Sequence, residues 1–143
     1  MISSQRSLPI KILIVGNIKK GDSILMRKKF AGSKPYLETW YSFGTEFIPG
    51  QDPRDTFVGY IQGFVGVIIR PTKRVFWDTE IKEDHDGITK QFVYLDLELE
   101  YVSGEPFVPE GLEKVEWILI ANLSKLDVVP PSVAFFKKLG YLE

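Results

Sequence analysis

Apolar and polar residues alternate along several stretches of this chain, a two-residue period that is typical of half-buried strands. The alternation is clearest from Phe92 onward, where aromatic and aliphatic residues take turns with polar and acidic ones. The pattern predicts strands over residues 10–15, 23–27, 75–77, 91–101 and 115–120. The first two strands form a predicted hairpin with its turn between Asn17 and Asp22, and residues 32–35 are predicted to form a loop.

Two helices are predicted from their start signals. Asp52 is a suitable N-cap and Pro53 suits the first helical position, so a helix should run from there to about Val65. A second helix should cover residues 132–139, and an acidic loop is expected over residues 80–87. The order of strands, helix, strands and helix indicates an α+β sandwich.

Composition indicates a single domain over residues 8–143, preceded by a loose lead-in at residues 1–7. The net charge of −1 provides no global attraction to nucleic acid or to an anionic membrane. The chain has no cysteine, which excludes disulfides and thiolate metal sites. Its apolar run at residues 10–15 is too short to span a membrane. Cytoplasmic residence is therefore expected.

The segment Trp40–Val67 ends in Gly66-Val67 and contains Gly50-Gln51-Asp52-Pro53 ahead of the predicted helix. With this spacing it resembles the Nudix box, in which Gly, five residues, Glu and seven residues precede Arg-Glu-aliphatic-any-Glu-Glu-any-Gly-aliphatic. The first Gly of the box falls on Thr45, the first Glu on Gln51, the Arg-Glu pair on Gly59-Tyr60, the aliphatic residue on Ile61 and the Glu-Glu pair on Gly63-Phe64.

The resemblance extends over roughly residues 8–140. Residues 12–27 are similar to the opening hairpin of Nudix domains, and residues 113–118 are similar to their Glu-x-x-x-Trp-Val strand. Residues 123–139 resemble the ending in which Leu and then Pro-Pro precede a last helix. The resemblance implies an α/β/α sandwich with a mixed central sheet. It also implies hydrolysis of a diphosphate linked to another moiety, with divalent cations as cofactors.

The acidic residues that would hold such a cation are replaced in this chain. The resembling helix positions are Tyr60, Gly63 and Phe64, and none of these side chains binds magnesium at neutral pH. The Arg and the first Glu of the box, which pair with each other in the family, correspond to Gly59 and Gln51. Loss of one partner would leave a buried charge at a cost of about 3–5 kcal/mol, whereas loss of both avoids it. A stable domain without catalytic residues, metal or other cofactor is therefore predicted.

Such a silent domain is predicted to be a binding module for a nucleotide-like ligand or a protein-interaction unit. The resemblance places these expected ligand-binding residues near the family's cleft: Trp40, Phe43, Gly44, Thr45, Tyr60, Gly63 and Phe64. Their aromatic rings are suited to stack on a base. The alternative is that the rings fill the vacated space as core, and that Gly59 and Gly63 pack against the preceding loop.

A divergent hydrolase of nucleoside diphosphate derivatives is the alternative function. Glu113 and Glu46 are its candidate catalytic residues, and Asp52 and Asp55 are further candidates to hold magnesium or manganese. His85, the only histidine, lies in the acidic loop, whose spacing fits no calcium loop.

Protein partners are a third alternative. A subunit of an assembly would use the sheet edge or Pro130-Pro131, and members of the Nudix family are often dimers, so a homodimer is one expected state. The aromatic content of 13% leaves room for an apolar interface. The sequence predicts no nucleic-acid patch and no membrane attachment.

Overall fold

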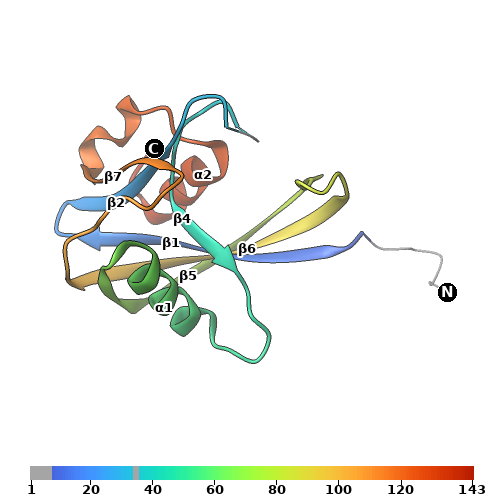
Figure 1. Ribbon diagram of the computed structural model, residues 1–143, viewed down its shortest axis with the longest axis horizontal. Coiled ribbons are helices and arrows are strands. Elements are labelled where there is room, and N and C mark those ends of the chain that lie inside the picture. Colours follow the sequence, from blue (N-terminus) through green and yellow to red (C-terminus); the bar gives the residue numbers. More distant parts are fainter. Residues whose placement is uncertain (1–7, 34–35) are drawn as a thin grey trace.

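The computed structural model describes residues 8–33 and 36–143, and its central feature is a mixed sheet flanked by two α-helices (Figure 1). The strands are β1 (Ile10–Lys20), β2 (Ser23–Lys29), β3 (Trp40–Tyr41), β4 (Phe43–Glu46), β5 (Ile68–Glu83), β6 (Thr89–Ser103) and β7 (Leu112–Leu119). The helices are α1 (Pro53–Val65), the 3-10 helix η1 (Ile120–Lys125) and α2 (Pro130–Leu139). The predicted α+β class with a mixed sheet is confirmed. The predicted lead-in at residues 1–7 lies outside the described residues.

Helix α1 forms where its capping signals predict it. The Asp52 side chain accepts a hydrogen bond from the Arg54 N–H at 2.8 Å, and Gly66 ends the helix with a φ of 78°. Glycine takes this left-handed conformation at low cost because it has no Cβ. Within the described residues, no helix has both the length and the apolar character needed to cross a membrane.

Several strands are longer than the sequence pattern predicts. Strand β1 continues to Lys20, so the hairpin turn is limited to Gly21-Asp22 instead of starting at Asn17. Residues 80–83 were predicted to be part of an acidic loop, but they belong to β5. Charged and apolar side chains alternate there, and alternation places them on opposite faces of the sheet.

The sheet divides into two branches, and this division opens the molecule between them. Strand β1 pairs with β2 only at the hairpin end, through Lys19↔Ile24 and Lys20↔Ser23. Nearer the start of the strand, at residues 13–16, β1 pairs with β4 on one side and runs parallel to β6 on the other. Strand β2 pairs instead with β3 and β7. The two branches therefore diverge from the β1–β2 turn and leave a gap that side chains must line.

Each face of the sheet has its own core. Helix α1 lies on one face, where Phe57 and its neighbours pack against Ile14 and Leu97. Helix α2 lies on the other face, where Phe136 packs with Met26 and Trp40. Figure 1 shows the two helices on opposite sides of the sheet, with the β5–β6 hairpin extending beyond both.

Strand β5 forms the outer edge of this sheet, since β6 is its only partner among the described strands. Two of its backbone groups are bound by side chains. The Trp77 carbonyl accepts a hydrogen bond from Lys138 Nζ of α2 at 2.7 Å, and the Thr79 N–H donates to Asp78 Oδ1 at 2.9 Å. Trp77 and Ile81 of the same strand are 69% and 63% exposed, so this edge carries apolar side chains next to bonded backbone groups.

Candidate ligand-binding cleft

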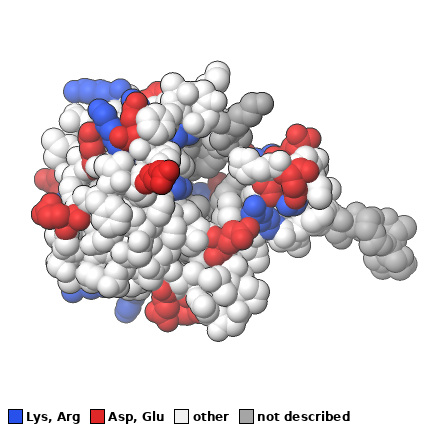
Figure 2. Space-filling view, in the orientation of Figure 1, with Lys and Arg blue, Asp and Glu red and all other residues white. Residues whose placement is uncertain are grey.

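A cleft of about 1260 Å³ opens where the two branches of the sheet diverge. It is lined by Leu13 and Val15 of β1, by Arg27 of β2, by the β3–β4 segment, by one face of β5 and β6, and by the start of α2. Figure 2 shows the molecular surface hollowed between the main body and the β5–β6 hairpin. The division of the sheet described above therefore positions the cleft.

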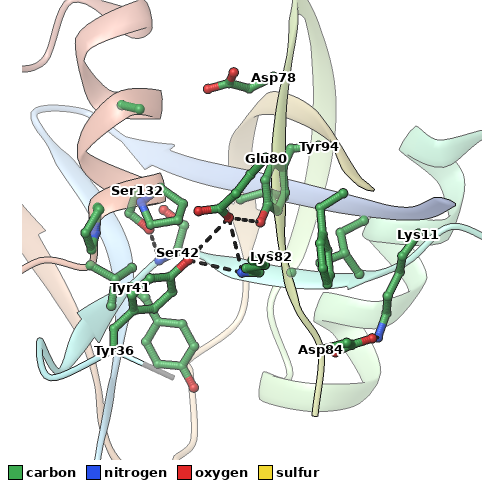
Figure 3. A pocket seen from close by; sticks show the side chains of 18 of the residues that line it. Lys11, Tyr36, Tyr41, Ser42, Asp78, Glu80, Lys82, Asp84, Tyr94 and Ser132 are labelled. Atoms are coloured by element: carbon green, nitrogen blue, oxygen red, sulfur yellow. Dashed lines mark hydrogen bonds and ion pairs between the residues drawn. The ribbon is translucent and has the colours of Figure 1, made fainter. Parts of the chain in front are cut away.

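One wall of the cleft is a hydrogen-bonded group of aromatic and charged side chains (Figure 3). Glu80 accepts hydrogen bonds from the Tyr94 hydroxyl at 2.6 Å and from the Tyr36 hydroxyl at 3.4 Å. Lys82 Nζ lies 3.2 Å from the Glu80 carboxylate and donates to the Tyr36 hydroxyl at 3.1 Å. Burial raises the pKa of Tyr94, and its bond to Glu80 adds to the shift. These contacts link four side chains, and the group is neutral as a unit because the charges of Glu80 and Lys82 offset each other.

The opposite wall contains Arg27, which extends from β2 toward the α1 side of the sheet. Its Nε donates to the Ser42 carbonyl at 3.2 Å, and its guanidinium carbon lies 3.9 Å from the centre of the Tyr41 ring. Burial lowers the pKa of Arg27, but an arginine remains charged at neutral pH. Among the described residues no carboxylate lies within ion-pair distance of it. The guanidinium is thus a cation that faces the cleft without an acidic partner.

The floor of the cleft contains a buried carboxylate, Asp96, at the middle of β6. Its side chain is 6% exposed, and its nearest cation is Lys138 Nζ at 3.9 Å. Burial raises the pKa of Asp96 to about 6, an effect that the Lys138 charge opposes and the Asp78 charge reinforces. Beside it, the Ser42 N–H donates to Ser132 Oγ at 3.1 Å and fixes α2 against the β3–β4 segment.

Ion pairs around Asp84 lie at the edge of the cleft, which Asp84 and Lys11 both line. The Asp84 carboxylate lies 2.8 Å from Lys90 Nζ and 3.0 Å from Lys11 Nζ, and these two bonds lower its pKa. Lys11 is also 3.4 Å from Glu46, a residue predicted as a catalytic or metal-binding alternative. His85 lines this edge as well. These ion pairs therefore hold the tip of the β5–β6 hairpin together and join it to Lys11 of β1.

Solved structures share this architecture. The model superimposes on a MutT protein from Methanosarcina mazei Go1 with a TM-score of 0.71 and 13% identity, covering 93% of this chain and 94% of that one. A MutT NUDIX hydrolase from Burkholderia pseudomallei gives a TM-score of 0.68 at 17% identity, with coverages of 91% and 98%. The chain has the Nudix fold. No protein-family model and no curated protein sequence matches it.

A further structure with the Nudix fold was solved with a ligand. The NUDIX domain of Shewanella oneidensis NrtR, described as complexed with ADP ribose, has a TM-score of 0.66 and 10% identity, and the match covers 98% of this chain and 91% of that one. Identities this low establish the common fold only.

The helix face at the Nudix-box positions is aromatic. The Tyr60 and Phe64 rings stack with their centres 5.3 Å apart, and Phe64 meets Phe43 edge-on at 6.3 Å. Tyr60 also lies 5.9 Å from Phe57, and burial raises the Tyr60 pKa. Both rings are partly buried against the α1 core, and neither lines the cleft.

The other predicted ligand-binding residues are divided between core and cleft. Trp40 and Phe43 are 7% and 0% exposed and belong to the two cores, whereas Gly44 and Thr45 line the cleft. Gly63 is exposed on α1, and a Cβ built there would meet no atom within 4 Å. The same holds for Gly59, so the expectation that these two glycines pack against the preceding loop is wrong.

The residues on α1 do not fit a divalent cation. In the described ranges no three His, Cys, Asp or Glu side chains lie close enough together to hold a metal ion. Glu113 forms an ion pair with Lys28 at 2.8 Å and does not line the cleft. Asp52 is bonded to Arg54, and Asp55 is exposed in the first turn of α1. The carboxylates named for the hydrolase alternative thus remain dispersed.

Sequence reasoning missed two charged residues that line the cleft, Arg27 and Asp96. Arg27 was visible as the first member of a basic cluster at the end of the predicted hairpin. Asp96 was visible as an acidic residue between two leucines in the strongest predicted strand. Each signal marks a charge in an apolar context, but neither shows that both charges face one cleft.

Proposed function

We propose that this chain is a Nudix-fold domain that binds a nucleotide-type ligand in the cleft without hydrolysing it. The observation that carries the proposal is Arg27, whose guanidinium faces the cleft beside the Tyr41 ring and has no carboxylate partner in the described part of the chain. A half-buried cation without an anion is stabilised by an anionic ligand, and a guanidinium matches the geometry of phosphate oxygens.

The aromatic side chains of the cleft support the same ligand class. Tyr36, Tyr41, Phe92 and Tyr94 all line it, and Phe92 and Tyr94 lie nearly parallel at 6.2 Å. Arg27 covers one face of Tyr41 at 3.9 Å and Lys82 covers one face of Phe92 at 4.7 Å, so a base would stack on a remaining ring face, where stacking contributes about 1–3 kcal/mol. The NrtR domain that shares the Nudix fold is described as bound to ADP ribose, which also contains a base and phosphates.

The absence of hydrolysis is inferred from the side chains of α1. A metal-dependent hydrolase needs oxygen ligands that position a cation against the diphosphate. Here the corresponding helix positions hold the Tyr60–Phe64 stack and Gly63, and Tyr60 and Phe64 are committed to packing. The ligand is therefore proposed to be held by Arg27 and the aromatic walls, with no need for a metal.

Calorimetric titration with AMP, ADP, GMP, GDP and ADP ribose, with and without magnesium, tests this proposal. We expect binding that does not require magnesium. Arg27→Met keeps the apolar stem and removes the charge, and it should weaken binding about tenfold or more. Lys28→Met is the matched control, since Lys28 is the next residue, is paired with Glu113 and lies outside the cleft.

Release of phosphate or nucleoside monophosphate is measured in parallel with magnesium and manganese. Product formed faster than in buffer, and abolished by chelation, would establish the hydrolase alternative and contradict the proposal. If no nucleotide gives heat with the wild-type protein, the ligand part fails and the protein-interaction role remains.

A further inference from the structure

The sheet has an uncharged face on the side that turns away from the cleft. Along β1, β6 and β5, alternation places one set of side chains in the cleft and the other set on this second face. The register of the three strands groups the second set into rows that run across them. The rows are Ile10-Gln91-Ile81, Ile12-Val93-Thr79, Ile14-Leu95-Trp77 and Gly16-Leu97-Val75, and none of these residues has an ionisable side chain. We call them the uncharged face; of its members, Thr79 at the sheet edge also borders the cleft.

The cleft side of the same strands carries the charges. Asp78, Glu80 and Lys82 alternate with the uncharged-face residues along β5. Lys11 does the same on β1, and Asp96 does the same on β6. A sheet with water on both sides carries polar side chains on both, whereas a sheet with one covered side is apolar on that side. The separation of charge therefore indicates that the uncharged face is covered by something.

Helix α1 covers only the inner end of the uncharged face. Ile14 and Leu97 are buried in the α1 core. Farther out, Ile10, Trp77 and Ile81 are each at least 63% exposed. Figure 1 shows this part of the β5–β6 hairpin extending beyond the helix. A contiguous apolar patch left open in this way marks a site of association.

The edge of β5 is poorly suited to pair with another strand. The Trp77 carbonyl and the Thr79 N–H are already bonded to the side chains of Lys138 and Asp78. A two-fold strand pair centred on Thr79 would also place Asp78 of one copy opposite Glu80 of the other, and like charges directly opposite each other destabilise a sheet. Packing of one face on another leaves both bonds in place and keeps these charges apart. Association should therefore occur through the side chains of the uncharged face.

We propose that a second copy of this chain covers the uncharged face, so that two molecules form a two-fold dimer with these faces packed together. A face without charge meets its own copy without repulsion, and the net charge of −1 does not keep the two chains apart. Different proteins select each other largely through complementary charges, which this face does not offer. Interfaces between identical chains are the more apolar class, and this face matches that composition.

The size of the uncharged face determines the expected strength of the dimer. An aromatic side chain can bury about 150–250 Å², so Trp77 at 69% exposure supplies about 100–170 Å² per copy. Ile10, Ile81 and Val75 add the exposed parts of three further apolar side chains. A standard interface buries about 800 Å² per partner around an apolar core. The uncharged face can form such a core, and we expect a reversible dimer with a dissociation constant of roughly 1–100 µM.

Sedimentation velocity and light scattering test the proposal on wild-type protein from about 1 µM to about 200 µM, a range that suits reversible interfaces. The average mass should rise from one chain toward two. Trp77→Lys and Ile81→Lys each introduce a charge on both faces of the dimer and should raise the dissociation constant about tenfold or more. Leu119→Lys is the matched control, since Leu119 is 52% exposed on β7, outside the uncharged face. Thermal melts show whether each variant is folded.

A cross-linking measurement leaves the apolar residues of the face intact. The chain has no cysteine, so Gln91→Cys introduces a single thiol in the middle strand of the uncharged face. A bis-maleimide that spans about 10 Å, the distance between packed sheets, should join two such chains. Ser103→Cys, at the other end of β6, should remain unlinked.

Three results would overturn the proposal. The wild-type protein would stay a single chain over the whole range, or both lysine substitutions would leave the dimer intact, or the cross-linker would join Ser103→Cys and not Gln91→Cys. None of these measurements involves a nucleotide. The function proposed above is therefore tested separately from the dimer.

Discussion

Asp96→Asn is expected to stabilise the folded protein at neutral and alkaline pH. Burial raises the pKa of this carboxyl from 3.8 to about 6, so the folded state holds its proton more tightly than the unfolded chain does. Each pKa unit corresponds to 1.36 kcal/mol, and the shift of about two units therefore amounts to about 3 kcal/mol. Above pH 6 the folded protein bears this cost in full, because Asp96 is charged in both states.

The sign of the pH dependence follows from the direction of the shift. Between about pH 4 and pH 6 the native state binds more protons at Asp96 than the unfolded state, so stability falls as pH rises through this window. An asparagine has no proton to lose. The stability of the variant relative to the wild type should rise by about 2–3 kcal/mol from pH 4 to pH 8. A buried amide without partners lowers the values at all pH equally, so the gain at pH 8 should be about 1–3 kcal/mol.

Urea unfolding followed by tryptophan fluorescence at pH 4, 5, 6, 7 and 8 measures this difference. The slope of free energy against urea concentration should be equal for the two proteins, so that midpoints can be compared directly. Glu100→Gln, in which an exposed carboxylate is removed from the same strand, should show no such pH-dependent gain. An Asp96→Asn protein that is less stable than the wild type at pH 8, or a difference that stays constant across the pH range, would refute the reasoning.

Three further substitutions, with Phe30→Ala as an exposed control, test the packing on the α1 side. Gly16→Ala should lower the free energy of unfolding by about 1–3 kcal/mol, because its Cβ would lie 2.5 Å from Phe57 Cζ. An unchanged melting temperature would contradict this and would mean that the Phe57 ring moves aside. Gly59→Ala should raise stability by about 1 kcal/mol, since the position is helical and open, and a lower melting temperature would contradict that view. Phe57→Ala should cost about 3–5 kcal/mol in urea unfolding, whereas Phe30→Ala, at a 52% exposed position, should change stability by about 0.5 kcal/mol or less. Equal losses of unfolding free energy in Phe57→Ala and Phe30→Ala would argue against the assignment of Phe57 to the core.

Local signals predicted the elements that depend on local chemistry. Helix α1 begins at the Asp52 cap and ends at Gly66 as expected, because both ends are set by side-chain and backbone preferences of single residues. The first hairpin and the long β6 strand followed from alternation. Strand β5 was underestimated because Pro71 and the charges near it interrupt the apolar pattern, and its pairing with β6 outweighs that interruption.

The position and lining of the cleft could not be predicted from local sequence patterns. The resemblance to the Nudix box correctly indicated the fold, and its positions Tyr60 and Phe64 stack on α1, where Tyr60 lies beside Arg27 without lining the cleft itself. Arg27 and Asp96 line one cleft only because β1 runs parallel to β6 and diverges from β2. Neither pairing is encoded in a short stretch of sequence.

The contact of Lys138 with the Trp77 carbonyl gives the C-terminal helix a protective role. An open strand edge beside exposed apolar side chains is a template on which further molecules can assemble. The protein keeps part of that template occupied with a side chain that it can supply only while α2 is docked. Fraying or truncation of the last twenty residues would therefore do more than remove a helix. It would also free the Trp77 carbonyl at the open edge of β5, beside the exposed Trp77 and Ile81 side chains.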